Sequence, residues 1–156
     1  MAISAAVDAS LRVLRVAQKL GVKRVVLTGS IASMMASMKT GTFGPSDWTN
    51  IEAPDVNTQA KSKTLTEKAA WDFINGQEGD APMELTVMVP GVVFGPPLGS
   101  NISGQSLSLM DQILRGKVPM VPNGAFPMVD VRDVSKLHVQ ALAIPEAAGK
   151  RIIVSR

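Results

Sequence analysis

The fold is decided by the stretch Arg24-Val25-Val26-Leu27-Thr28-Gly29-Ser30, in which a valine-rich run ends at a turn of small residues. A continuous apolar run of this length is typical of a strand covered on both faces, as in a parallel sheet. We therefore predict a buried strand over residues 22–27, with Ser30 just after its carboxyl end. In open α/β sheets, ligands bind at that end of the strands.

The residues before this strand predict an amphipathic helix over residues 4–20. Four charged residues follow one stripe and apolar residues cover the rest, so the helix packs on more than one neighbour. Gly21 is a helix stop signal. Helix, glycine turn and buried strand together form the closing half of a βαβ unit.

The residues after the strand predict a long loop over 31–58 and then a helix over about 57–75, which opens with Lys61-Ser62-Lys63. Loops of this length are usually functional or disordered. Apolar anchors favour an ordered loop over the edge of a site. These anchors are Met34, Met35, Met38, Phe43 and Trp48.

The second half of the chain alternates in the same way. A strand over 84–89 should end before Pro90, because proline cannot donate to a central ladder, and Pro90 to Pro97 should form a constrained loop. We expect helices over about 104–115 and 131–143, an extended piece over 127–129 and a last strand over 152–154. The prediction is a single α/β domain over residues 1–156 with a parallel sheet.

Composition excludes several classes of function. The 156 residues include no cysteine and one histidine, so thiol chemistry and a zinc site are not expected. The net charge of +3 comes from scattered lysines and arginines, which argues for solubility rather than nucleic-acid binding. No apolar run reaches the ~20 residues of a membrane span. With no signal-peptide pattern, we expect a cytoplasmic protein.

Glycine motifs that bind phosphate are absent from these residues. Neither G-x-G-x-x-G nor G-x-x-x-x-G-K-[ST] occurs. Ser30 and Lys63, each taken alone, are best explained as a turn serine and a solvated lysine. Asp130, Arg132 and Asp133 are best explained by helix capping and a surface ion pair, and His138 by a structural role.

Four blocks of the chain resemble the extended short-chain dehydrogenase/reductases, a branch of the NAD-dependent epimerase/dehydratase superfamily. Within it, the blocks are most similar to dihydroflavonol reductases, cinnamoyl-CoA reductases and related aldehyde reductases. The blocks come in the family's order and cover nearly the whole chain. They are Gly21 to Ser30, Lys61 to Trp71, Pro90 to Pro96 and Val129 to Val134.

This resemblance implies NAD(P)H-dependent reduction of a small carbonyl compound on a Rossmann-type sheet. The family uses a serine to orient the carbonyl, a tyrosine to move the proton, and a lysine to hold the nicotinamide ribose and lower the tyrosine pKa. Ser30 and Lys63 would take the first and last roles. The residues that would contact NADP or NAD are Thr28, Gly29, Lys63, Pro90, Gly91, Val92 and Val93.

Two departures from the family pattern follow from the same alignment. Gln59 stands where the tyrosine belongs, and the chain contains no tyrosine. An amide does not titrate usefully, so Gln59 cannot relay a proton as a phenol does. The chain also corresponds only to the C-terminal, nicotinamide and substrate portion, without the N-terminal dinucleotide-binding strands. The strand before Ser30 should then have an open edge, which a homodimer partner or a second chain would cover.

Three hypotheses stay open from the sequence. The chain is a truncated reductase that is inactive alone, a non-catalytic relative that binds a small molecule or a partner, or a weak reductase completed by another subunit. The retained Ser30 and Lys63 keep the third open, whereas the missing glycine-rich turn favours the first two.

Overall fold

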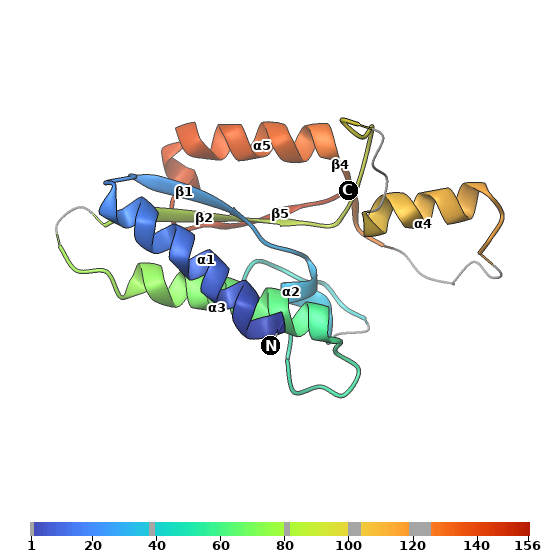
Figure 1. Ribbon diagram of the computed structural model, residues 1–156, viewed down its shortest axis with the longest axis horizontal. Helices are drawn as coiled ribbons and strands as arrows, with labels where there is room; N and C mark the ends of the chain where they lie inside the picture. Colours follow the sequence, from blue (N-terminus) through green and yellow to red (C-terminus); the bar gives the residue numbers. More distant parts are fainter. Residues whose placement is uncertain (1, 38–39, 80–81, 100–103, 119–125) are drawn as a thin grey trace.

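The computed structural model describes residues 2–37, 40–79, 82–99, 104–118 and 126–156. Helices and strands alternate along most of the chain, as Figure 1 shows. In chain order they are α1 (Ala2–Lys19), β1 (Arg24–Thr28), α2 (Ala32–Met35), α3 (Thr58–Asn75), β2 (Glu84–Pro90), β3 (Val92–Phe94), α4 (Gln105–Leu114), β4 (Met128–Asp130), α5 (Val131–Ala143), the short 3-10 helix η1 (Pro145–Ala147) and β5 (Arg151–Val154).

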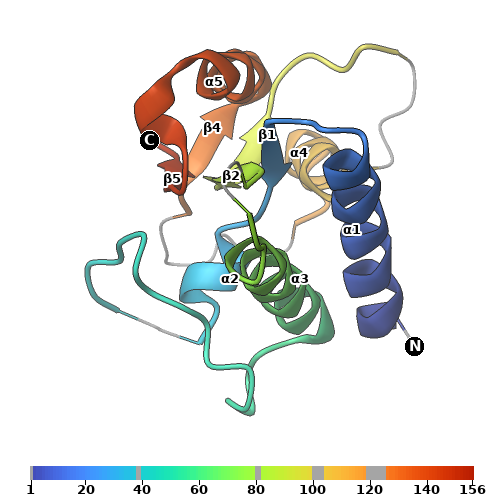
Figure 2. The same ribbon diagram turned by 90° about the vertical axis from the view of Figure 1, so that its left-hand side faces the viewer.

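Two parallel sheets form the centre of the fold. Strands β1, β2 and β5 make a three-stranded sheet in that order, and β3 pairs with β4 in a second sheet of two strands. Helices α1, α2 and α3 cover one face of the larger sheet and α5 covers the other, which is clear end-on in Figure 2. The predicted α/β class with a parallel sheet and flanking helices is confirmed.

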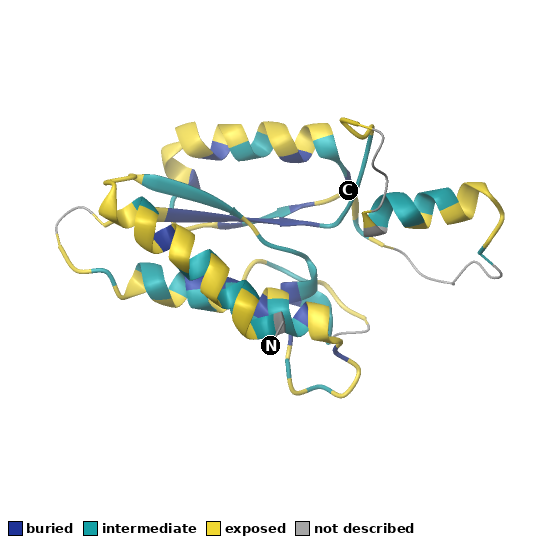
Figure 3. Cartoon of the chain, in the orientation of Figure 1, coloured by how far each residue is buried: buried dark blue, intermediate teal, exposed yellow. Residues whose placement is uncertain are grey.

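Side chains of β2 divide the core into two halves, because successive residues of a strand point to opposite faces. Leu85, Val87 and Val89 pack toward α1 and α3, whereas Met88 packs with Val154 toward α5. Figure 3 shows the buried residues concentrated along β2 and on the helix faces that meet the sheet. Most of β2 is therefore shielded from solvent on both sides.

The predicted burial of the first strand is wrong. Residues 24–27 of β1 are half-buried and Thr28 is exposed, because β1 is an edge strand that pairs on one side only within the described part of the chain. The buried central strand is β2 instead. Which apolar run becomes the central strand depends on pairing with strands distant in sequence, and the local pattern does not encode that pairing.

The prediction around Pro90 also needs correction. Strand β2 includes Pro90, which pairs in register with Val154. The Pro90 carbonyl accepts a hydrogen bond from the Ile31 N–H (3.0 Å), which lies beyond the end of β1. The N–H and the carbonyl of a strand residue point to the same side, so an N–H at position 90 would also lie beyond β1. Proline therefore removes no hydrogen bond between β1 and β2. Residues 92–94, expected to be loop, form β3, and the long loop contains the short helix α2.

The other predicted elements are confirmed with small shifts at their ends. Asp130 caps α5, since its side chain accepts a hydrogen bond from the Arg132 N–H. Gly21 follows α1 with a positive φ of 70°, as expected for a helix stop. Met38 lies outside the described residues. Within the described part of the chain, no helix is long and apolar enough to cross a membrane.

Candidate functional site

A cavity of about 550 Å³ lies at the carboxyl ends of β1 and β2. Its lining comes from four separate segments of the chain: the turn after β1, the start of α3, the end of β2 with β3, and α4. The lining residues are Gly29, Ser30, Ile31, Ala32, Gln59, Lys63, Pro90, Gly91, Val92, Val93, Ser106 and Leu109. The cavity thus brings together every residue predicted for the site except Thr28.

The turn after β1 places Ser30 at the cavity. The Gly29 N–H donates to the Met88 carbonyl (2.7 Å), and the Ser30 hydroxyl oxygen accepts a hydrogen bond from the Ala32 N–H (3.2 Å). A Cβ on Gly29 would lie 2.9 Å from Val87 Cγ1, so only glycine allows this close approach to β2. The Ser30 hydroxyl proton can still be donated to a ligand.

Helix α3 supplies Gln59 and Lys63, one turn apart and both exposed. The helix begins after Asn57, whose side chain accepts a hydrogen bond from the Ala60 N–H (2.9 Å). No hydrogen bond or ion pair engages Lys63 within the described part of the chain. Its ammonium therefore carries three donors and a positive charge at the rim of the cavity.

The end of β2 and the start of β3 form the apolar wall. The Gly91 N–H donates to the Val154 carbonyl (3.0 Å) and the Val92 N–H to the Pro127 carbonyl (2.8 Å). A Cβ on Gly91 would clash with the Pro127 carbonyl. Glycine at this position thus lets the chain pass from the larger sheet to the smaller one.

Thr28 lies apart from this cavity. Its hydroxyl is 2.8 Å from Nε2 of His138, and the other ring nitrogen of His138 lies 2.8 Å from the Val134 carbonyl. These contacts give His138 the structural role that the sequence predicts. Thr28 and Lys63 also line a smaller cavity of about 150 Å³ between α1, β1 and α3.

Sequence reasoning missed a buried polar cluster below the turn. Glu67 of α3, Arg151 of β5 and Ser33 of α2 are buried and hydrogen-bonded to one another. Glu67 follows Lys63 by four residues, which places it on the same helix face, and this spacing was the only available signal. Nothing in the sequence pairs it with Arg151.

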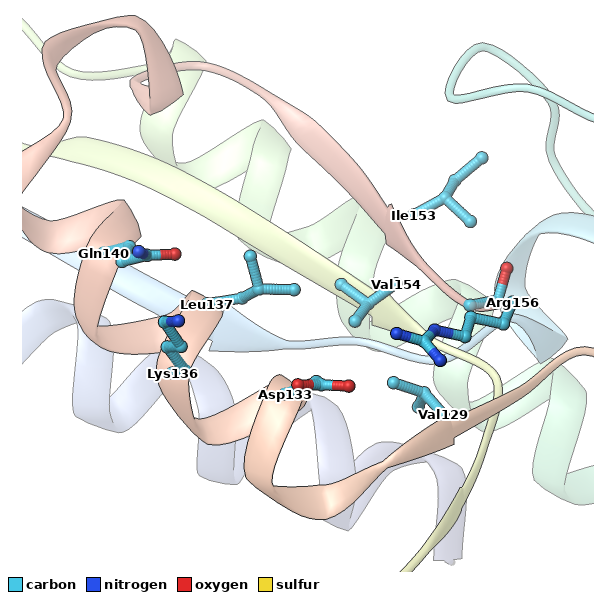
Figure 4. Close-up of a pocket in the computed structure, with 9 residues that line it drawn as sticks. Val129, Asp133, Lys136, Leu137, Gln140, Ile153, Val154 and Arg156 are labelled. Carbon is cyan, nitrogen blue, oxygen red and sulfur yellow. The ribbon is translucent and has the colours of Figure 1, made fainter.

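A further cavity of about 330 Å³ lies between α5 and β5, and Figure 4 shows its lining. Asp133, Lys136 and Gln140 line it from α5, and Arg156 from the end of β5. It contains none of the predicted site residues. Arg132 instead pairs with Asp130 (2.6 Å), as predicted. The Arg132 side chain and backbone N–H lower the pKa of Asp130 to about 2.

The arrangement at the larger cavity suits a polar group that gains negative charge. The Ser30 hydroxyl and the Gln59 amide can donate hydrogen bonds, and Lys63 contributes charge. No group of three or more histidine, cysteine, aspartate or glutamate side chains could hold a metal ion among the described residues. Among the described residues, no titratable proton donor other than Lys63 lines this cavity.

Comparisons with known proteins give a matching family model and several similar reductases. The model of the NAD dependent epimerase/dehydratase family matches residues 2–155. The NADPH-dependent methylglyoxal reductase Gre2 of Saccharomyces cerevisiae is 31% identical over 148 residues, covering 86% of this chain and 43% of the relative. Cinnamoyl-CoA reductase 2 of Arabidopsis thaliana is 31% identical over 153 residues, covering 95% of this chain and 45% of the relative. The chain thus spans less than half the length of these relatives.

A solved structure is similar over almost the whole chain. The yeast methylglyoxal/isovaleraldehyde reductase Gre2, complexed with NADPH, superposes with a TM-score of 0.81 at 30% identity. The match covers 96% of this chain and 49% of the reductase. The arrangement of helices and strands is therefore that of about half of a larger reductase.

Proposed function

The chain belongs to the NAD-dependent epimerase/dehydratase family, and on this premise we propose that it forms the nicotinamide and substrate site of a carbonyl reductase. The observation that carries the proposal is the single cavity that gathers Ser30, Gln59, Lys63 and residues 90–93 from distant parts of the chain. The names of the similar proteins, an NADPH-dependent methylglyoxal reductase and a cinnamoyl-CoA reductase, support a small carbonyl substrate and NADP as cofactor.

The lining of the cavity fits the nicotinamide end of such a cofactor. Lys63 has no hydrogen-bond or ion-pair partner among the described residues, so its donors are available to ribose hydroxyls, and Val92 and Val93 offer an apolar wall to a ring. A bound nicotinamide would supply the hydride. No G-x-G-x-x-G turn occurs in these residues, so the pyrophosphate has no dedicated binding loop here.

The residues of this chain would orient the carbonyl but not complete the proton transfer. Ser30 donates a hydrogen bond to the carbonyl oxygen and stabilises the charge that develops there. Gln59 can add a hydrogen bond but has no acidic proton to give. Absence of the general acid alone lowers the rate by about 10²–10⁴. We therefore propose an impaired reductase.

Replacement of Gln59 tests this proposal. Gln59→Tyr places a phenol one turn before Lys63, and the rate of methylglyoxal reduction by NADPH should rise by about 10²-fold or more. NADPH oxidation, followed by absorbance with the purified chain, measures the rate. The matched control is Gln59→Tyr with Lys63→Ala, which keeps the phenol and removes the charge that would lower its pKa. Absence of NADPH binding up to millimolar concentration in all variants would contradict the proposal.

The open edge of β1 favours a second candidate, a non-catalytic relative that binds a partner chain there or forms a homodimer. Within the described part of the chain, β1 pairs only with β2, which leaves its outer backbone groups free to accept another strand. Light scattering at tens of micromolar should then report a mass above that of one chain. A monomer at these concentrations would count against this candidate and leave the first one standing.

A further inference from the structure

The buried ion pair between Glu67 and Arg151 links helix α3 to strand β5. Nε of Arg151 donates to Oε1 of Glu67 (2.6 Å), and Nη2 lies 3.3 Å from Oε2. Glu67 is 1% exposed and Arg151 8% exposed. Charges are rarely buried unless they are paired and hydrogen-bonded. The other donors of Arg151 should therefore also have hydrogen-bond acceptors.

All five N–H groups of the guanidinium have an acceptor. Besides the two bonds to Glu67, Nη2 donates to Oγ of Ser33 (3.0 Å), and Nη1 donates to the carbonyl oxygens of Pro45 (3.1 Å) and Asp47. The guanidinium also stacks on the ring of Trp48, with 3.9 Å between Cζ and the ring centroid. One side chain therefore ties α2, α3 and the loop at 45–48 to β5. Lysine has three donors and no planar fork, so it cannot replace these contacts.

Ser33 connects this cluster to the turn that carries Ser30. The Ser33 N–H donates to the Ser30 carbonyl (2.9 Å), while the Ser33 hydroxyl is hydrogen-bonded to Glu67 and lies 2.7 Å from the same carbonyl. A hydroxyl has one proton, and a charged acceptor forms the stronger bond, so this proton goes to Glu67. The Ser30 carbonyl is held by the Ser33 backbone, and Ser33 is held by the cluster.

The same carboxylate lies close to both functional segments. An ideal Cβ on Gly29 would be 3.4 Å from Oε2 of Glu67, and Glu67 follows Lys63 by one helical turn. We propose that Glu67 and Arg151 are positioning residues, which hold the Ser30 turn and the Lys63 helix in one fixed arrangement through Ser33. This inference rests on the proposed function for its consequence, but the positioning can be measured without a ligand.

The chain offers a matched control at the other end of the sheet. Arg24 pairs with Glu84 (2.7 Å), and its guanidinium also donates to the carbonyl oxygens of Ala141 (3.0 Å) and Ile144 (2.6 Å). This second arginine likewise forms an ion pair, and it ties the C-terminal end of α5 to β1. It lies at the start of β1, whereas Ser30 follows the end of that strand, so its loss should disturb the fold without moving the site.

The experiment compares Ser33→Ala, Glu67→Gln and the control Arg24→Lys in the full chain. Ser33→Ala leaves the ion pair in place and removes only the hydroxyl that connects it to the turn. Amide hydrogen exchange, measured by NMR without ligand, should accelerate about tenfold or more at Gly29 and Ser33 in the first two variants, and not at the centre of β2. Glu67→Gln keeps the shape of the side chain, and it provides a second variant if Ser33→Ala fails to fold.

Titration with NADPH provides the second readout. The affinity should fall about tenfold in Ser33→Ala and Glu67→Gln, because small displacements of positioned groups weaken their contacts with a ligand, and it should stay within about twofold in Arg24→Lys. Unchanged exchange at Gly29 and Ser33 would overturn the inference, as would losses of affinity that merely follow overall stability in all three variants. If the unmodified chain does not bind NADPH, the proposed function is wrong. The exchange rates alone then decide the inference, with local acceleration supporting it and none overturning it.

Discussion

At the scale of single residues, the side chain at position 59 matters most for the proposed function. Gln59 can help to orient a substrate but cannot transfer a proton to it. Gln59 lines the same cavity as Ser30 and Lys63, which in the proposed function would orient a carbonyl. The amide can form hydrogen bonds but does not gain or lose a proton, whereas a phenol beside a lysine can. In the proposed function, the side chain at position 59 and not the fold would therefore limit the reaction.

A second residue-scale feature is the cap of α5, where Arg132 lowers the pKa of Asp130 from 3.8 to about 2. A carboxyl whose pKa is lower in the folded state stabilises the protein above its unfolded pKa, and this contribution is lost as the pH falls from about 4 to about 2. The Asp130 carboxyl resonance should therefore titrate with a midpoint of about 2 in an NMR experiment.

Substitution of the arginine gives the matching control. Arg132→Gln removes the side-chain hydrogen bonds to Asp130 (2.8 and 2.6 Å) and should raise its midpoint toward 3.8, whereas Asp133→Asn should leave it almost unchanged. A midpoint near 3.8 in the unmodified chain would show that the cap and the ion pair are not formed in solution.

At the scale of elements, the passage from β2 to β3 builds the apolar wall of the cavity. The chain leaves the larger sheet after Pro90 and enters the smaller one at Val92, so a single glycine separates two sheets. Helix α4 then extends beyond the carboxyl ends of the strands, as Figure 1 shows, and contributes Ser106 and Leu109 to the cavity. The site depends on the close approach of Gly91 to the Pro127 backbone.

Gly91→Ala should therefore destabilise both the fold and the site. The added methyl group would meet the Pro127 backbone, which cannot rotate away, and overpacking of this kind costs about 1–3 kcal/mol. The midpoint of urea unfolding measures the loss. Gly99→Ala is the control, because beyond its chain neighbours no atom of the described residues lies within 4 Å of the Cβ it would add. Equal midpoints in the two variants would contradict the close approach of Gly91 to the Pro127 backbone.

At the scale of the whole molecule, the Glu67–Arg151 pair joins parts of the chain that are 84 residues apart. Removal of one partner leaves a buried charge without compensation, whereas removal of both leaves none. Glu67→Gln and Arg151→Met should each lower the free energy of unfolding by about 3–5 kcal/mol, and the double variant should lose clearly less than their sum. Denaturant unfolding of the four proteins measures this coupling. Additive losses would mean that the two side chains do not interact in solution.

Much of the architecture could be predicted because it is encoded locally. The periodicity of residues 4–20 and 57–75, the stop at Gly21 and the cap at Asp130 each depend on residues within a turn or two, and the structure contains all of them. Burial of the strand before Ser30 was predicted wrongly, and β3 was missed. Both features depend on strand pairing that a short apolar run does not encode: β1 has a partner on one side only within the described residues, and β3 pairs with the distant strand β4.

By itself, the sequence determined the α/β class, the approximate bounds of the four long helices, and the chemical groups available for the site, including the amide at Gln59 in place of a phenol. Only the tertiary structure decided that β2 is the strand buried on both faces, that residues 92–94 form a strand paired with β4, and that Arg151 uses all its donors beneath the Ser30 turn. The physical reason is range. Helix propensity, capping and side-chain chemistry act between near neighbours, whereas strand order and buried ion pairs depend on which distant segments pack together.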